Sequence, residues 1–198
     1  MMDASIYRRP EKPLRCSLNV VSKSVSVQRR DTTMKPLFVH KSTECHVTPE
    51  NTSVDMARYL IDRIGNHGSF LEPQCGTGNL IGALIGQGVL PEQIQAVEHH
   101  FDLKEVTERR YGINVHHGCF LEYSSNCHQR FDGIIANPPF KHVRKHMAAK
   151  EKLLKPDGVI IALVPSTFHG EGYEDLEDLP MNLFPTAKVN TKLVAFQS

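Results

Sequence analysis

Residues 137–140, Asn-Pro-Pro-Phe, follow a run of residues that bury well and carry groups suited to chemistry on a planar amino group. An amino group on an aromatic ring is a poor nucleophile, because its lone pair is delocalised into the ring. The oxygens of the Asn137 side chain and the Pro138 carbonyl could both accept its N–H bonds and localise the lone pair, since proline holds φ fixed. The ring of Phe140 could stack on a base, a contact worth ~1–3 kcal/mol. We interpret these residues as a clamp for an arylamine or amide NH2 group, because a simple strand stop leaves the aromatic ring unexplained.

A second candidate is the glycine-rich turn at 72–78, Glu-Pro-Gln-Cys-Gly-Thr-Gly. Gly76 and Gly78 would let the backbone turn sharply and approach a ligand. The turn is neither a P-loop nor a G-x-G-x-x-G motif, since Ile81 stands where the third glycine would be. Glu98 ends the next predicted strand, and an acid at about this interval accepts hydrogen bonds from ribose hydroxyls in nucleotide-binding sheets. A tight strand–helix turn and a solvated strand end remain the alternatives.

Hydrophobic spacing predicts the elements that must position these groups. Thr48-Pro49 is expected to cap the first helix and supply its first proline. Helices alternate with strands, which predicts an α/β fold: a Rossmann-like, doubly wound, mostly parallel sheet with a C-terminal antiparallel strand or hairpin. The predicted helices are 52–64, 79–88, 99–112 and 146–158, the last stopped by a glycine, and the predicted strands are 69–73, 94–98, 113–118, 131–136, 159–165 and 188–196.

Ligands of such sheets lie beyond the carboxyl ends of the strands. This rule places four features along one edge of the sheet: Glu72–Gly78, Glu98, Gly118–Phe120 and Asn137–Phe140. The candidate clamp and the candidate nucleotide-binding turn are therefore expected to face one site.

Composition bounds the class of protein. The chain has 198 residues, 40% hydrophobic and 23% charged, with a formal net charge of +1, so total charge does not indicate a partner. Five cysteines without a CxxC pair favour a reducing, cytoplasmic location over a disulfide framework. No apolar run approaches the ~18–20 residues of a membrane span. The group His116-His117-x-Cys119 lacks a second ligand pair, so we predict no metal.

Residues 1–40 differ from the rest of the chain, with eight basic and three acidic residues and no long hydrophobic periodicity. We predict a basic, flexible N-terminal extension, either a tail or an arm that contacts nucleic acid. A start nearer Met34 is a further alternative. Residues 41–198 are predicted to form the catalytic domain.

Over about residues 45–196 the chain resembles the class I S-adenosylmethionine-dependent methyltransferases, and among them the N6-adenine DNA methyltransferases. Residues 72–78 resemble the family's cofactor loop, which usually begins with an acid and a proline, and Ala96-Val97-Glu98 resembles the strand whose acid binds the cofactor ribose. Asn137–Phe140 resembles the catalytic Asn/Asp-Pro-Pro-aromatic motif. His46–Pro49 is similar to the segment that closes over the methionine end of the cofactor, and Val189–Thr191 to a late Asn-Thr pair.

The resemblance implies S-adenosylmethionine as cofactor and a role for each matching residue. Methyl transfer from a sulfonium is an in-line displacement governed by positioning, so no metal or general base is assigned. The implied catalytic residues are Asn137, Pro138, Pro139 and Phe140, and the implied cofactor-binding residues are Thr48, Pro49, Glu72, Pro73, Gly76, Gly78, Glu98, Cys119, Phe120 and Asn137.

Lys141, Arg144 and Lys145 follow the clamp and could hold the phosphates beside a flipped nucleotide, or could simply form a solvated helix face. Two departures from the family stand out. Cys119 replaces the acid that usually binds the cofactor adenine, and sulfur is a weak acceptor. No separate recognition region fits before the last strand, and the acidic segment 170–178 is unsuited to phosphate contact.

DNA is the first hypothesis for the substrate, favoured by the Thr48-Pro49 element. The same motif occurs in enzymes that methylate an RNA base or a protein glutamine amide, as in release-factor methyltransferases. A cofactor-binding subunit without turnover is the third hypothesis. The target sequence and the oligomeric state are not determined by the sequence.

Overall fold

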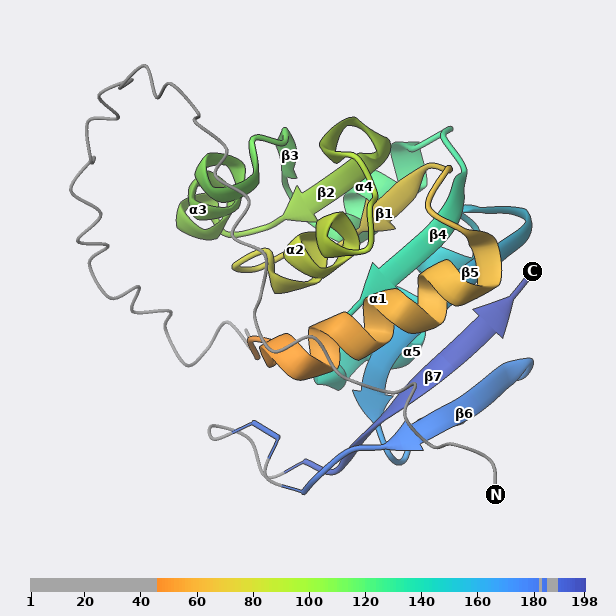
Figure 1. The fold of residues 1–198 in the computed structure, drawn as a ribbon. Coiled ribbons are helices and arrows are strands. Elements are labelled where there is room, and N and C mark those ends of the chain that lie inside the picture. The colour runs from red at the N-terminus through yellow and green to blue at the C-terminus, as the bar shows by residue number, and fades with distance from the viewer. Residues whose placement is uncertain (1–45, 182, 185–188) are drawn as a thin grey trace, which may run out of the picture. The chain divides into compact units, whose positions relative to one another are not determined.

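The computed structural model describes residues 46–181, 183–184 and 189–198 (Figure 1). The predicted extension over residues 1–40 lies outside these residues, and its prediction stands untested.

The described strands form one mixed sheet of seven strands in the order β3-β2-β1-β4-β5-β7-β6 (Figure 1). Neighbours among β1 to β5 run parallel, while β7 runs antiparallel to both β5 and β6. This confirms the predicted Rossmann-like sheet with a C-terminal antiparallel hairpin. The strands are β1 Phe70–Glu72, β2 Ile94–Glu98, β3 Val115–His117, β4 Phe131–Ala136, β5 Leu154–Pro165, β6 Tyr173–Asp178 and β7 Thr191–Gln197.

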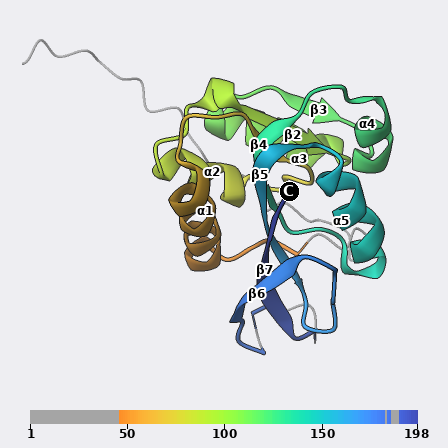
Figure 2. The ribbon, with the colours of Figure 1, turned by 90° about the vertical axis from the view of Figure 1, so that its right-hand side faces the viewer.

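Helices cover both faces of the sheet, with α1 and α2 on one side and α4 and α5 on the other (Figure 2). Neighbouring residues of one strand therefore enter different cores: Ile135 packs with Leu60 of α1, and Ile134 packs with Met147 of α5. Burial on both faces explains why β4 and β5 read as continuous apolar runs. The helices are α1 Glu50–Ile64, α2 Asn79–Gly86, α3 Phe101–Tyr111, α4 Phe120–Asn126 and α5 Val143–Glu151, with short 3-10 turns at Pro91–Gln93 and Phe140–His142.

The start of α1 differs from the prediction. The helix begins at Glu50 with Pro49 as its N-cap, and no side chain caps it. The backbone N–H and the hydroxyl of Ser53 both donate to the Pro49 carbonyl. The hydroxyl of Thr48 is thus not used as a helix cap.

The predicted helix over 146–158 is wrong in its second half, because α5 ends at Glu151 and β5 begins at Leu154. Gly158 lies inside β5 next to Asp157, which has a positive φ of 64° at a shift in the β4–β5 register. A Cβ on Gly158 would lie 2.9 Å from the Lys155 carbonyl oxygen and 3.0 Å from that of Phe131. The glycine therefore permits close strand approach rather than a helix stop.

Two further elements were not predicted. Residues 120–126 form α4, although Ser124, Ser125 and Asn126 are poor helix formers; their side chains donate back to carbonyls of the same helix. The acidic segment expected as a loop forms β6 along its second half. Within the described part of the chain, no helix is long and apolar enough to cross a bilayer.

Candidate active site

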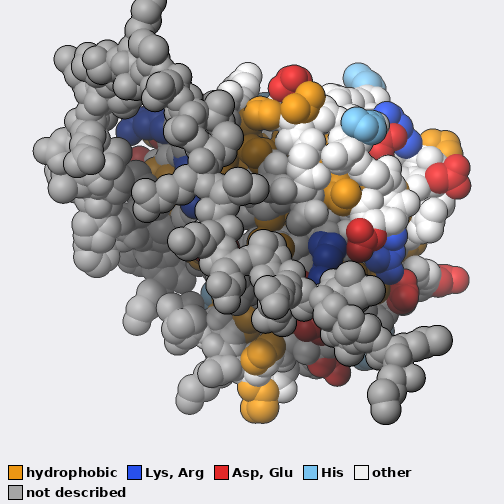
Figure 3. Space-filling view, viewed as in Figure 1, with side chains coloured by type: hydrophobic (Ala, Val, Ile, Leu, Met, Phe, Trp, Pro, Cys, Tyr) orange, Lys and Arg blue, Asp and Glu red, His pale blue; other side chains and the backbone are white. Residues whose placement is uncertain are grey.

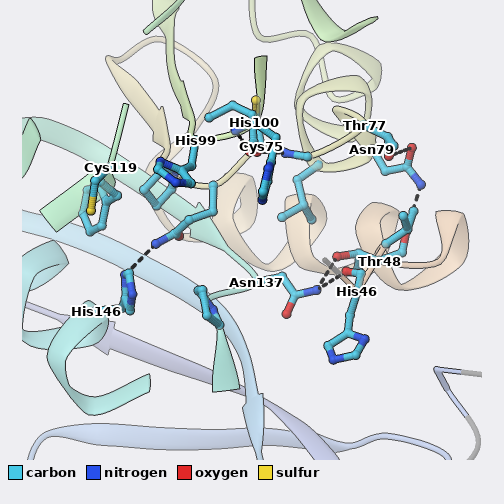
Figure 4. A pocket seen from close by; sticks show the side chains of 18 of the residues that line it. His46, Thr48, Cys75, Thr77, Asn79, His99, His100, Cys119, Asn137 and His146 are labelled. Carbon is cyan, nitrogen blue, oxygen red and sulfur yellow. Dashed lines mark hydrogen bonds between the residues drawn. The ribbon is translucent and has the colours of Figure 1, made fainter. Parts of the chain in front are cut away.

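A cavity of about 260 Å³ opens at the carboxyl ends of the parallel strands (Figure 4). It joins four segments that are distant in sequence: the chain before α1, the β1–α2 turn, the ends of β2 and β3, and the end of β4. The strand-end rule predicted all of these segments except the chain before α1. Its lining includes His46, Thr48, Pro73, Gln74, Gly76, Asn79, Glu98, Cys119, Phe120, Asn137, Pro139 and His146.

The side-chain amide of Asn137 is held by the segment before α1 (Figure 4). Its Nδ2 donates to the His46 carbonyl oxygen at 2.8 Å and to the Thr48 hydroxyl at 3.1 Å. A carbonyl can only accept, so this contact determines which end of the amide faces His46. The amide oxygen remains to accept an N–H bond from a ligand.

Thr48 connects this amide to the β1–α2 turn. It is buried, and its carbonyl oxygen accepts a hydrogen bond of 2.9 Å from Nδ2 of Asn79, the first residue of α2. The Oδ1 atom of Asn79 in turn accepts from Thr77 at 3.4 Å and from Arg110 at 3.2 Å. The clamp and the turn therefore share one hydrogen-bonded support.

Phe140 takes part in a cluster of three rings beside the clamp. Its ring stacks on His46 with centroids 5.3 Å apart and meets Phe184 edge-on at 6.0 Å. Pro139 lines the cavity, whereas Pro138 and Phe140 do not. A base that stacked on Phe140 would have to share that ring with His46.

The carboxylate of Glu98 organises the β1–α2 turn. Its two oxygens accept the backbone N–H groups of Gly76 and His100, both at 2.7 Å. Gly76 has a positive φ of 52°, which brings this N–H toward the acid at the end of β2. A carboxylate has about four acceptor sites, so Glu98 can still accept hydroxyl hydrogens from a ligand in the cavity.

Gly78 has the positive φ of 82° that a sharp turn requires, and it also has a packing role. A Cβ on Gly78 would lie 2.6 Å from the ring of Tyr111, and one on Gly82 would lie 2.5 Å from the Tyr111 hydroxyl. Both glycines let α2 pack closely on α3. Gly78 does not line the cavity.

A buried polar cluster lies behind the cavity wall. Gln74 Nε2 and His146 Nδ1 are 2.7 Å apart, and the ammonium of Lys150 lies 4.9 Å from the ring centre of Phe120. Glu72 and Lys150 are fully buried. Three side-chain atoms of this cluster have no hydrogen-bond partner among the described residues: Glu72 Oε2, Gln74 Oε1 and Lys150 Nζ.

Burial changes the protonation of this cluster. It raises the pKa of Glu72 well above the usual value for a carboxyl, although the Gln74 N–H bond acts in the opposite direction. It lowers the pKa of Lys150 to about 7, against the attraction of Glu72, and with Lys150 it lowers the pKa of His146 to about 4. His146 is therefore a neutral imidazole at the cavity wall near pH 7.

The remaining predicted residues fall into two groups. Cys119 and Phe120 line the cavity as the sequence suggested for its cofactor end. Arg144 donates to the His169 carbonyl at 3.0 Å and lies over the ring of Phe168. Pro49, Glu72, Lys141, Arg144 and Lys145 lie outside the cavity lining, and their assigned roles remain predictions.

Sequence reasoning missed Gln74, Asn79, His146 and Lys150. Asn79 carried a signal, since a side-chain amide directly after the Gly-x-Gly turn can reach back over it. The α5 residues carried none, because their role depends on which helix face meets β1.

Comparisons with known proteins agree with the fold. No protein-family model matches the chain. The structure resembles a Listeria monocytogenes protein assigned to the class I S-adenosylmethionine-dependent methyltransferases, with TM-score 0.61 and 18% identity, over 77% of this chain and 60% of that one. It also resembles the 23S rRNA methyltransferase ErmE, with TM-score 0.63 and 14% identity, over 77% and 69%. The chain has the class I methyltransferase fold.

The methyltransferase fold is shared with a Vibrio vulnificus YJ016 protein assigned as a modification subunit of a type I restriction enzyme, with TM-score 0.63 and 16% identity, over 77% of this chain and 44% of that one. In sequence, the chain is 26% identical to the modification methylase CviBIII of Paramecium bursaria Chlorella virus NC1A. That match covers 58% of this chain and only 36% of the viral protein.

Replacing Glu98 by Gln should weaken binding of S-adenosylmethionine by about 10- to 100-fold, because hydrogen bonds to a charged acceptor contribute ~1.5–3 kcal/mol. The Gln amide also cannot accept from both backbone donors through two oxygens. Isothermal titration of the cofactor measures this. Glu105→Gln is the matched control, because this half-buried carboxylate of α3 pairs with Arg109 and does not line the cavity. Equal affinity in both variants would remove Glu98 from the site.

Replacing Lys150 by Met should alter stability in a pH-dependent way. The folded-state pKa of about 7 lies below the ordinary value of 10.5, so the destabilising effect of burying this ammonium is complete below pH 7 and fades up to pH 10.5. In the variant, the Glu72 carboxylate loses the nearby cation. Its ionisation as pH rises therefore also lowers the stability of the variant relative to wild type. Thermal denaturation should show the variant's relative midpoint highest at pH 6 and lower at pH 9. A difference that stays constant with pH, like that expected for the exposed Lys152→Met, would contradict a buried ammonium.

Proposed function

We propose that the protein is an S-adenosylmethionine-dependent methyltransferase that methylates the N6 amino group of adenine in DNA. The observation that supports this most directly is the orientation of the Asn137 amide. With Nδ2 committed to His46 and Thr48, the amide oxygen is left to accept an N–H bond beside the cavity.

The residues around the cavity suit this cofactor. Glu98 offers a buried carboxylate for ribose hydroxyls, the turn at Gly76 presents backbone to the ligand, and Phe120 offers an apolar ring beside Cys119. The polar groups at Thr48 and Asn79 stand at the opposite end of the cavity from Cys119 (Figure 4). When bound, S-adenosylmethionine supplies a methyl group activated by a sulfonium.

The chain's contribution to catalysis is orientation. The Asn137 oxygen and the Pro138 carbonyl hold the acceptor nitrogen by its N–H bonds, which turns its lone pair away from the ring. The Asn137 amide is held by its hydrogen bonds to His46 and Thr48, and the φ of Pro138 is fixed by its ring, so little rearrangement is needed as charge develops on nitrogen. No side chain is assigned as a general base, and the amino proton leaves to solvent after transfer.

DNA as acceptor is supported by the partial match to a modification methylase. The chain spans only 36% of the viral methylase and 60% of the Listeria protein. The activity and substrate of those longer proteins are therefore assigned to this chain only as part of the proposal. An RNA base and a glutamine amide offer the same kind of N–H donor to Asn137. The experiment must therefore compare all three acceptors.

The test uses tritium-labelled S-adenosylmethionine with unmethylated genomic DNA, total RNA and release factor in parallel. We expect label in DNA that digests to N6-methyladenine. Label in RNA or in release factor would retain the chemistry and overturn the substrate. Cofactor binding without label in any acceptor would support the subunit without turnover.

Replacing Asn137 by Ala should abolish transfer, by at least 100-fold in kcat, because the removed amide is one of two acceptors for the reacting amino group. Cofactor affinity should change little, and isothermal titration would measure it. Retained transfer would disprove the clamp.

Replacing Thr48 by Val removes one acceptor of the Asn137 amide while keeping side-chain shape. A neutral hydrogen bond contributes ~0.5–1.5 kcal/mol, so we expect kcat to fall about 2- to 10-fold. Thr48→Ser keeps the hydroxyl and should retain most of kcat. An equal loss in both variants would indicate that packing, rather than the hydrogen bond, is what Thr48 provides.

A further inference from the structure

Most of the described cations without an ionic partner fall within one range of the chain, residues 130–152. Arg110, which donates to Asn79 and lies over the ring of Tyr111, is the unpaired cation described outside that range. Over the described residues outside 130–152, six basic side chains form ion pairs: Arg58, Arg63, Lys104, Arg109, Lys155 and Lys192. On the α1 side, basic and acidic side chains accordingly lie beside each other (Figure 3). Between 130 and 152 no described ion pair involves a basic residue of that range: Arg130, Lys141, Arg144, Lys145, Lys150 and Lys152.

These unpaired cations have different surroundings. Lys150 is buried in the cluster behind the cavity, and Arg144 donates to the His169 carbonyl. Lys141, Lys145 and Lys152 are exposed and make no described hydrogen bond, and Arg130 donates only to nearby backbone carbonyls. Exposed like charges without ionic partners repel one another, which favours a surface that meets an anion.

A groove of about 850 Å³ runs between α4 and α5, which lie side by side on one face of the sheet (Figure 2). Lys145 and Lys152 line it from the α5 side, and Arg130 lines it from the start of β4. Ser124 and Asn126 of α4 add neutral polar groups, and Glu122 is the one acidic residue described in its lining. The groove therefore combines net positive charge with neutral polar groups in its lining.

Helix α5 separates this groove from the cavity. His146 lines the cavity, while Lys145, the residue before it, lines the groove. At Lys145 the two sites are thus about one helix diameter, ~10–12 Å, apart. Lys145 and Lys152 are seven residues apart, which is ~10.5 Å along a helix.

Strand β6, at one edge of the sheet, is unsuited to bind a phosphate backbone. β6 exposes Glu174, Asp175, Glu177 and Asp178, and a phosphate backbone would be repelled there. A strand whose base reaches Asn137 would accordingly leave the site along α5.

We propose that the groove between α4 and α5 binds the phosphodiester backbone of the DNA strand that carries the methyl-accepting base. This inference rests on the proposed function, since it assigns the path of that substrate. Contacts of this kind position a strand without reading its sequence. The chain between β5 and β7 contains the acidic segment 170–178, which is unsuited to phosphate. The groove would supply the phosphate contacts instead.

The test measures binding of a fluorescein-labelled, single-stranded DNA oligonucleotide by anisotropy between 50 and 300 mM KCl (about the range in which such contacts are screened). With a single strand, each phosphate contact contributes ~0.7 to the slope of log K against log salt. The double variant Lys145→Gln/Lys152→Gln should lower that slope by about 1.4, and Arg130→Gln by about 0.7. Arg58→Gln, an ion-paired cation of α1, should leave the slope unchanged. Thermal melting of each variant checks that it is folded.

An unchanged slope in the double variant would overturn the groove as a DNA site. So would an RNA oligonucleotide of the same sequence that binds with the predicted slopes while DNA does not bind. Methyl transfer in parallel separates the two proposals: equal KM for DNA in wild type and double variant overturns the groove and leaves the proposed function standing. If neither protein methylates DNA, the proposed function fails, and the salt slopes alone decide whether the groove holds DNA.

Discussion

The side-chain amide of Asn137 has two N–H bonds, and both are donated to the segment that precedes α1. The segment at the carboxyl end of β4 therefore depends on residues 46–48, which lie about ninety positions earlier in the chain. The same segment reaches Asn79 at the start of α2 through the Thr48 carbonyl. The clamp and the β1–α2 turn are thus held in register by one short stretch of backbone, so a shift of either is transmitted to the other.

Glu98 performs the corresponding task on the other side of the cavity. Its carboxylate accepts hydrogen bonds from two backbone N–H groups, that of Gly76 in the β1–α2 turn and that of His100 before α3, and so links the two segments. A carboxylate with two strong backbone donors is held rigidly, and a rigid acceptor is suited to select a hydroxyl-bearing ligand. Next to this site, one polar atom each of Glu72, Gln74 and Lys150 is buried without a hydrogen-bond partner among the described residues. Such unpaired buried atoms are unusual in a protein interior.

The sequence correctly predicted the parallel sheet and the meeting of the segments that follow its strands at one edge. β2 and β4 occupy the predicted residues, because each is an apolar run bounded by turn residues or prolines. The α5–β5 junction was mispredicted, because Pro156-Asp157-Gly158 resembles a helix stop while the glycine is required by the close approach of β4. Gly78 resembled a ligand-approach glycine for a similar reason, since the nearby Tyr111 ring that requires it comes from α3. Tertiary neighbours of this kind are not visible in local patterns.

The two edges of the sheet limit how this protein can associate with copies of itself. β3 has only three residues, and β6, the other edge, carries four acidic residues within six. Antiparallel pairing of two β6 strands would bring like charges opposite one another, which opposes growth of the sheet from molecule to molecule. The acidic strand that is unsuited to phosphate therefore also disfavours edge-to-edge aggregation.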